Sequence, residues 1–236
     1  MSAGWTAKRF WTAATAEPAG PGFTVRLDGR PVKTPAKAPL VVPTEALARA
    51  IAAEWDAQQG RVRPETMPCT RAANSAIDKV APLRAEVIAE LAGYGGSDLM
   101  CYRAEAPPAL VARQAAAWDP LLDWARDTLA APLRVTAGVI PVPQPAESLA
   151  RLTDRVAGFD DFQLAGLHDL VAISGSLVLA LAVAEGRLTA EDAFELSRLD
   201  NRWQAEQWGA DAEEAETEAL RRAAFVQADR FLGLCR

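Results

Sequence analysis

The segment at residues 191–216, EDAFELSRLDNRWQAEQWGADAEEAE, has apolar residues on two sides of a predicted helix. At helical spacing, Leu196, Leu199 and Trp203 fall on one side, which is the stripe that a helix buries against its own domain. A smaller apolar patch of Phe194, Ala205 and Trp208 falls on nearly the opposite side. Two interpretations stay open: the helix lies between two neighbours of its own domain, or one of its faces binds a partner protein.

The residues after this helix are acidic. Gly209 predicts the helix end, as a C-cap glycine does, and the carboxylates beyond it fall at the start of the next predicted helix. Negative charge at a helix N-terminus suits the helix dipole, so a solvated helix start is the main interpretation. A partner contact or an ion site is the alternative. The acidic residues are Asp211, Glu213, Glu214, Glu216 and Glu218.

The N-terminal part of the chain has a different pattern, typical of strands. Residues 23–27 alternate into Asp28-Gly29, a strong signal for a two-residue β-hairpin turn. Thr44 then predicts the N-cap of a helix whose apolar positions include Trp55. This part is predicted to be a small β-rich domain with one helix.

Helical periodicity dominates from residue 67 to the end. Strands first and helices afterwards favour an α+β fold, with a small β-rich domain at 1–66 followed by a larger all-helical domain at 67–236. Two stretches, at 98–102 and 135–143, are predicted to be extended linkers between helices. The predicted helices cover 70–79, 83–94, 108–131, 147–157, 161–184, 189–209 and 213–231.

Composition narrows the class of protein. The 236 residues carry a net charge of −6 with no basic block, which argues against a nucleic-acid or anionic-membrane surface. The most apolar run, 170–184, is shorter than the roughly 20 residues of a membrane span, and no signal peptide is predicted at the N-terminus. Three widely spaced cysteines fit a reducing compartment without disulfides or a zinc site.

No catalytic constellation is evident in the sequence. His168 is the only histidine, so a triad mechanism would have to use it. The glycine-rich string at 93–97 is not followed by a lysine at the spacing of a phosphate-binding loop. The residues therefore favour a binding protein without cofactor or metal. The alternative is a small-molecule-binding protein or a hydrolase that uses His168 and the acidic turn.

Several uncommon strings occur together between residues 9 and 216. They are RFW at 9–11, LDGRPVKTP at 27–35, EWD at 54–56, MPCT at 67–70, DLMCYR at 98–103, Gln114 with WDP at 118–120, and WQ at 203–204 with WGAD at 208–211. In these strings the chain resembles the assembly chaperones of the F-type ATP synthase catalytic head that act on its α subunit, in mitochondria and α-proteobacteria. It departs from them at Asn201, where glutamate is usual, and at Met100, where leucine is usual.

The resemblance implies a chaperone without nucleotide chemistry. Its client would be the unassembled α subunit, whose exposed subunit-interface surface it would shield until the β subunit displaces it. A bacterial member would be cytoplasmic, whereas eukaryotic relatives work in the mitochondrial matrix. Trp55 and Trp118 are expected at structural positions. By matched position, the expected partner-binding residues are Glu195, Asp200, Trp203, Gln204, Gln207, Trp208, Asp211 and Glu213.

Overall fold

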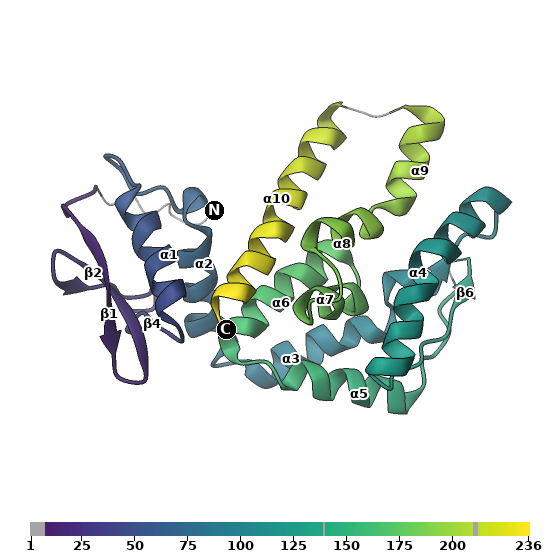
Figure 1. The fold of residues 1–236 in the computed structure, drawn as a ribbon, viewed down its shortest axis with the longest axis horizontal. Coiled ribbons are helices and arrows are strands. Elements are labelled where there is room, and N and C mark those ends of the chain that lie inside the picture. The colour runs from purple at the N-terminus through teal and green to yellow at the C-terminus, as the bar shows by residue number, and fades with distance from the viewer. Residues whose placement is uncertain (1–7, 139, 210–211) are drawn as a thin grey trace. The chain divides into compact units, whose positions relative to one another are not determined.

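The computed structural model describes residues 8–138, 140–209 and 212–236, which form two compact units (Figure 1). Of the described residues, the first unit contains those up to Arg84, together with Asp160–Gly166 and Arg230–Arg236. The second contains those within Ala85–Phe159 and Leu167–Asp229. The predicted α+β class is confirmed, since an antiparallel sheet comes first and the remainder is mostly helical. The predicted division into domains at 1–66 and 67–236 stays a prediction.

The sheet of the first unit is built around its second strand. β2 pairs antiparallel with β1, β3 and β4. The predicted hairpin is confirmed: Asp28 and Gly29 join β2 to β3 with φ values of 46° and 79°, the two positive angles of a type I′ turn. The strands are β1 at Ala14–Ala19, β2 at Gly22–Leu27, β3 at Arg30–Pro31 and β4 at Val41–Val42.

Helix α1, Glu45–Asp56, packs against β1 and β2. Thr44 is its N-cap, as predicted, and the Thr44 Oγ1 accepts a hydrogen bond of 3.1 Å from the backbone N–H of Leu47. The ring of Trp55 lies edge-on to that of Trp11, with centroids 5.2 Å apart. Trp55 is 3% exposed and therefore belongs to the core of this unit. The unit also contains η1 at Pro64–Thr66, α2 at Pro68–Ser75 and the π-helical turn η2 at Ala76–Val80.

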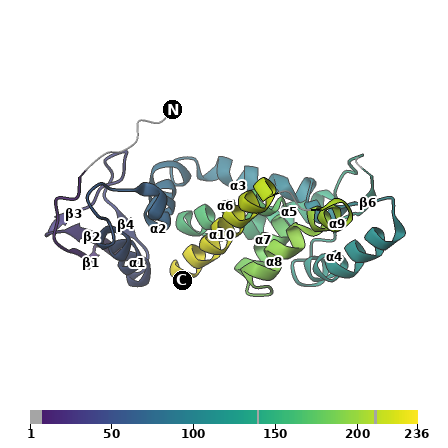
Figure 2. The same ribbon diagram turned by 90° about the horizontal axis from the view of Figure 1, so that it is seen from above.

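The second unit is helical, and Figure 2 shows α7 in its middle. All eight residues of α7 are buried. Two helices, α6 and α10, have one end in each unit. The helices are α3 at Arg84–Gly93, α4 at Pro108–Thr128, α5 at Ala146–Ala157, α6 at Asp161–Ser174, α7 at Leu177–Ala184, α8 at Ala190–Ser197, α9 at Leu199–Trp208 and α10 at Ala212–Leu234, with 3-10 turns η3 at Tyr94–Gly96 and η4 at Leu99–Cys101.

Three sequence expectations about this unit are wrong in detail. The helix predicted at 161–184 is divided at Gly175, whose φ of 71° ends α6 before Ser176 caps α7. The helix predicted at 189–209 is divided at Arg198. The two stretches predicted as linkers pair with each other, because β5, Tyr102–Arg103, and β6, Thr136–Ala137, form a short parallel ladder.

Candidate functional site

The segment at 191–216 is divided into two helices at Arg198, and this division decides which of its residues are buried. Thr189 is the N-cap of helix α8, and its Oγ1 accepts from the Asp192 N–H at 3.0 Å. The helix buries Phe194 against Phe225 of α10, with ring centroids 5.9 Å apart. The backbone at Arg198, with φ −104° and ψ 12°, ends α8 and changes the direction of the chain. One helical projection therefore does not describe both halves. Phe194, expected on the smaller patch, is core.

Helix α9 is fastened to α4 by polar contacts along one side. Asp200 Oδ1 accepts a hydrogen bond of 2.7 Å from Gln114 Nε2, while Gln114 Oε1 accepts from the Ala104 N–H at 2.8 Å. Gln114 is 1% exposed, so both contacts form away from solvent. Asp200, predicted to bind a partner, thus contributes to an internal network. Such a network holds a helix in one position when few apolar side chains do so.

A second link between α4 and α9 is charged. The Arg113 guanidinium donates to both carboxylate oxygens of Glu206, at 2.6 and 2.9 Å, and lies 5.9 Å from the ring centroid of Trp203. The hydrogen bond from Arg113 holds the pKa of Glu206 below its usual range. Trp203 is half-buried. Arg113 was not among the sequence-predicted residues, since it is 93 positions from Glu206 in the chain.

Trp118 anchors the other end of this region. Its side chain is fully buried, and its Nε1 donates a hydrogen bond of 3.0 Å to the carbonyl oxygen of Leu196 at the end of α8. The Arg103 guanidinium lies 5.2 Å from the Trp118 ring centroid and also pairs with Asp119 at 2.8 Å. Trp118 therefore holds the chain in place where α8 ends and α9 begins.

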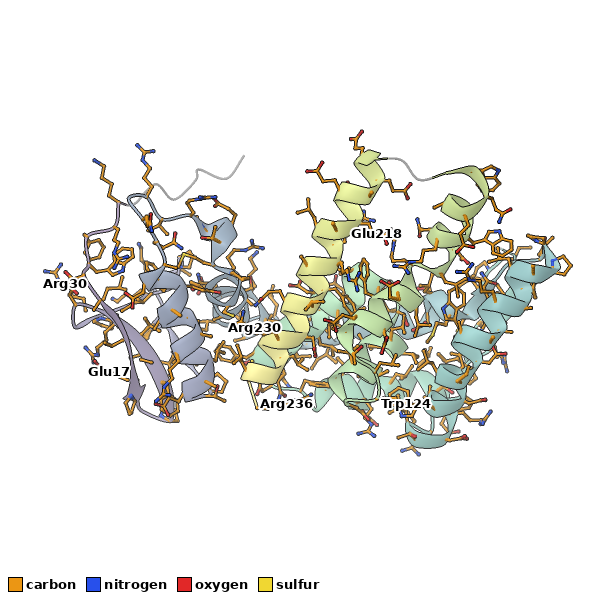
Figure 3. The ribbon with its side chains drawn as sticks, turned by 45° about the horizontal axis from the view of Figure 1, so that its top comes forward. Glu17, Arg30, Trp124, Glu218, Arg230 and Arg236 are labelled. Atoms are coloured by element: carbon orange, nitrogen blue, oxygen red, sulfur yellow. The ribbon has the colours of Figure 1, made fainter. Side chains whose placement is uncertain are left out.

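The inner side of α9 faces α10 across a cluster of alternating charges. Glu195 pairs with Arg202 and, at 3.5 Å, with Arg222, while Arg202 lies 3.7 Å from Glu218. Figure 3 labels Glu218 on the part of α10 that faces α9. Residues of this cluster line a cavity of about 370 Å³ between the two helices. Glu195, predicted as a partner contact, therefore supports the spacing of α9 and α10.

The outer side of α9 and the start of α10 are exposed. Trp208 is 79% exposed, and Gln204 and Gln207 are exposed on the same helix. Glu213 is exposed in the first turn of α10, as the dipole argument predicts. Asp211 lies outside the described residues. Of the predicted residues, the structure thus makes Gln204, Gln207, Trp208 and Glu213 accessible to a partner.

The side chains that could take part in catalysis or metal binding are not well placed for either role. His168 lies in α6, where Nδ1 is 3.3 Å from Asp169 Oδ1. Burial raises the pKa of the Cys101 and Cys235 thiols to about 12, so both stay protonated and weakly nucleophilic. Within the described ranges, no group of histidine, cysteine and carboxylate side chains is arranged to hold a metal ion. Nor does any described helix have the length and apolarity needed to cross a bilayer.

Comparison with known proteins gives consistent matches. Residues 8–126 match the model of the ATP12 chaperone protein family. The crystal structure of Atp12 from Paracoccus denitrificans superposes with a TM-score of 0.95 at 53% identity, covering 98% of this chain and 99% of that one. Atu1473 from Agrobacterium tumefaciens gives a TM-score of 0.93 at 43% identity, covering 98% and 87%. The mitochondrial protein atp12 of Schizosaccharomyces pombe is 28% identical, covering 91% of this chain and 78% of that protein.

Proposed function

The chain belongs to the ATP12 chaperone family, which serves assembly of the F-type ATP synthase, and we propose that it binds the unassembled α subunit of the catalytic head. The proposed contact is the outer face of α9 with the first turns of α10. The supporting observation is Trp208, which is 79% exposed although tryptophan is among the residues that contribute most to protein interfaces. Because the family is non-enzymatic, the hydrolase interpretation of His168 and the acidic turn is wrong.

The mechanism that we propose is steric shielding. A subunit that has not yet met its neighbours exposes apolar surface that the assembled complex buries, and such surface aggregates. Trp208 would insert into that surface, while Gln204 and Gln207 would supply adaptable hydrogen bonds around it. The β subunit would displace the chaperone because it covers the same surface more extensively. No covalent step and no cofactor are required.

The acidic residues at the start of α10 would guide this encounter. Glu213, Glu214 and Glu216 are exposed and lie within two turns of the helix N-terminus. Exposed charges of one sign increase association rates and select orientation more than they add affinity. We therefore propose that the client surface around the Trp208 contact is basic. As for the compartment, we propose the bacterial cytoplasm, where the α subunit would be made.

Co-elution provides the test. The purified chain should elute with the unassembled α subunit from the same organism, and the complex should dissolve when the β subunit is added. Trp208→Ala should weaken the complex by roughly 10-fold or more, as loss of a central aromatic anchor does. Glu213→Lys should reduce the association rate, with a smaller loss at high salt.

Two matched controls test whether the loss of client binding is specific to the α9–α10 surface. Ile140→Ala removes another large exposed apolar side chain, since Ile140 is 75% exposed. Glu147→Lys reverses an acidic residue at the same position of another helix, because Glu147 is second in α5 as Glu213 is second in α10. Both controls should bind α normally. If the two α9–α10 variants bind as tightly as the controls, the assigned surface is wrong; if no α co-elutes at all, the assigned client is wrong.

A further inference from the structure

The first unit contains a cavity that the proposed client contact does not use. Its volume is about 700 Å³, within the range of roughly 300–1,000 Å³ found for ligand pockets. Its lining residues all belong to the first unit and come from the segment before β1, the β2–β3 hairpin, the loop after β3, α1, η1, α2 and Met67 before α2. Aromatic and apolar side chains form most of its wall, including Phe10, Trp11, Trp55 and Met67. The cavity therefore offers an apolar interior.

One aromatic residue at this cavity, Phe10, is largely exposed to solvent. Phe10 is 65% exposed and packs edge-on against Trp11, with ring centroids 5.2 Å apart and planes at 84°. A large exposed aromatic beside an apolar cavity is the kind of surface that a partner covers.

The charge of the lining is opposite to that of the whole chain. The protein has 31 acidic and 25 basic residues, yet the cavity lining includes four exposed cations and no aspartate or glutamate. Two of the four lysines in the sequence are among them. Among the described residues, none of these four cations forms an ion pair within the chain, although Arg30 acts electrostatically on Asp28 and Arg71 on Glu65. The four cations are Arg30, Lys33, Lys37 and Arg71.

Two carboxylates near this region, Asp28 and Asp78, already accept hydrogen bonds from within the chain. Asp28 accepts from the N–H groups of Thr12 and Ala13 at 2.9–3.1 Å. Asp78 accepts from Thr34 Oγ1 at 2.6 Å and from the Ala36 N–H at 3.0 Å. These contacts anchor the loop that carries the lysines. Figure 3 labels Arg30, which lies at the β2–β3 hairpin.

Lys37 is held in a backbone conformation that favours glycine. Its φ is 72°, and its N–H donates to the Thr34 carbonyl oxygen at 2.9 Å. Thr34 and Ala38 close the turn through a backbone hydrogen bond, also of 2.9 Å. Side chains with a Cβ are disfavoured at positive φ, so lysine here lowers stability relative to glycine. A strained residue that keeps a cation at the cavity suggests that its charge has a use.

We propose that this cavity binds an acidic segment of a partner protein that carries an aromatic side chain. The aromatic ring occupies the apolar interior beside Trp11 and Met67, and the neighbouring carboxylates meet the cations at the mouth. Charge complementarity selects an acidic segment over a basic one. The exposed Phe10 ring extends the apolar surface beyond the cavity interior, which favours a protein segment over a small aromatic anion. The site is independent of the α9–α10 surface.

The probe for this proposal is the peptide acetyl-Asp-Glu-Phe-Asp-Glu-amide, titrated calorimetrically into the full chain at low salt. Two control peptides isolate its features: one has glycine in place of phenylalanine, and the other has lysine at all four acidic positions. Only the acidic aromatic peptide should bind measurably. Equal binding of the glycine peptide would overturn the proposal, because it would show attraction by charge alone. Absence of binding by the acidic aromatic peptide would also overturn it.

Charge-reversal variants locate the site. Lys33→Glu combined with Arg71→Glu should weaken peptide binding at least about 10-fold. Lys79→Glu is the matched control, because Lys79 is exposed in the same unit but does not line the cavity, and it should bind the peptide normally. Trp208→Ala should also bind it normally, so failure here is distinct from failure of the α9–α10 assignment. Equal losses in Lys79→Glu and the double variant would contradict the assignment of the cavity.

Lys37→Gly should change thermal stability and peptide affinity in opposite directions. Glycine relieves the strained backbone, so the midpoint of thermal unfolding should rise by about 1–3 °C. The same change removes a cation, so the peptide affinity should fall several-fold. A variant that fails to fold cannot produce this result. Peptide affinity equal to that of the parent chain would show that Lys37 has no part in binding.

Discussion

Helices α7 and α9 belong to the same unit and have similar lengths, but different forces hold them. All eight residues of α7, Leu177–Ala184, are buried, whereas Leu199 is the one buried residue that the structure gives for the ten-residue α9. Burial on every side fixes α7 and leaves it no surface to offer. Polar links along one side fix α9 and leave its other side, with Trp208, exposed. The contrast separates residues that maintain the fold from residues that can meet a partner.

The buried helix depends on one carboxylate at its N-terminus. Asp98 is fully buried and accepts hydrogen bonds from the Ser176 hydroxyl at 2.8 Å and from the Val178 N–H at 3.0 Å. Burial raises the pKa of Asp98, while these hydrogen bonds oppose the shift. Ser176 in turn accepts from the Leu179 N–H at 3.0 Å. Asp98 therefore satisfies groups that the start of a buried helix would otherwise leave without partners.

The largest expected effect is the loss of this carboxylate. Asp98→Ala should lower the free energy of unfolding by roughly 3–5 kcal/mol, because the Ser176 hydroxyl and the Val178 N–H would stay buried without an acceptor. Urea unfolding followed by circular dichroism measures this loss. Asp123→Ala is the control, since Asp123 is exposed, and it should change stability by less than about 0.5 kcal/mol. Similar losses in the two variants would contradict the structural role given to Asp98.

Loss of the hydrogen bonds that link α4 to α9 should have an intermediate effect on stability. Gln114→Ala removes the acceptor of the Ala104 N–H and the donor to Asp200, which should cost about 1–3 kcal/mol. The consequence should be local, because few buried side chains support α9. Hydrogen exchange should accelerate in α9 much more than in α7. Equal acceleration in both helices would show that α9 is held by something other than this network.

Structural features that depend on a few neighbouring residues could be predicted from the sequence. The turn at Asp28-Gly29 and the cap at Thr44 were predicted correctly, because turn and cap chemistry depend on a few neighbouring residues. The exposed carboxylate at Glu213 followed from the same kind of rule. Local rules did not locate the division at Arg198, since a change of helix direction depends on tertiary contacts such as Trp118 with the Leu196 carbonyl.

Contacts between residues that are distant in the sequence could not be predicted, for a related reason. The strands β5 and β6 have two residues each, so alternation of apolar residues cannot reveal them. The same limit applies to Arg113 and Glu206, whose charges meet only in the folded chain. Of the eight predicted partner-binding residues, Glu195 and Asp200 make internal contacts, which a helical projection could not distinguish from exposed ones. The cavity lined by Lys33 and Lys37 was not predicted either, because its walls come from segments that are distant in the sequence.

Trp208 should behave in the opposite way to the buried residues. Trp208→Ala removes a side chain that is 79% exposed, so stability should change by less than about 0.5 kcal/mol. Urea unfolding should give the same midpoint as the parent chain, although client binding is weakened. A loss above about 1 kcal/mol would place Trp208 in the packing of α9 and weaken the contrast between the two helices. Phe194→Ala, at a fully buried position, should instead cost about 3–5 kcal/mol.

The smallest expected effect concerns the exposed ion pair that also fastens α9. The hydrogen bond from Arg113 lowers the pKa of Glu206, so the folded state favours its carboxylate more than the unfolded state does. The resulting stability is present above the unfolded pKa, near 4.5, and is lost as the pH falls through the lower folded pKa. Glu206→Gln should therefore be slightly less stable than the parent chain at about pH 7. The difference should close in acid and also in about 1 M salt, which screens exposed charges. A difference that persists under both conditions would mean that Glu206 supports α9 through packing rather than through its charge.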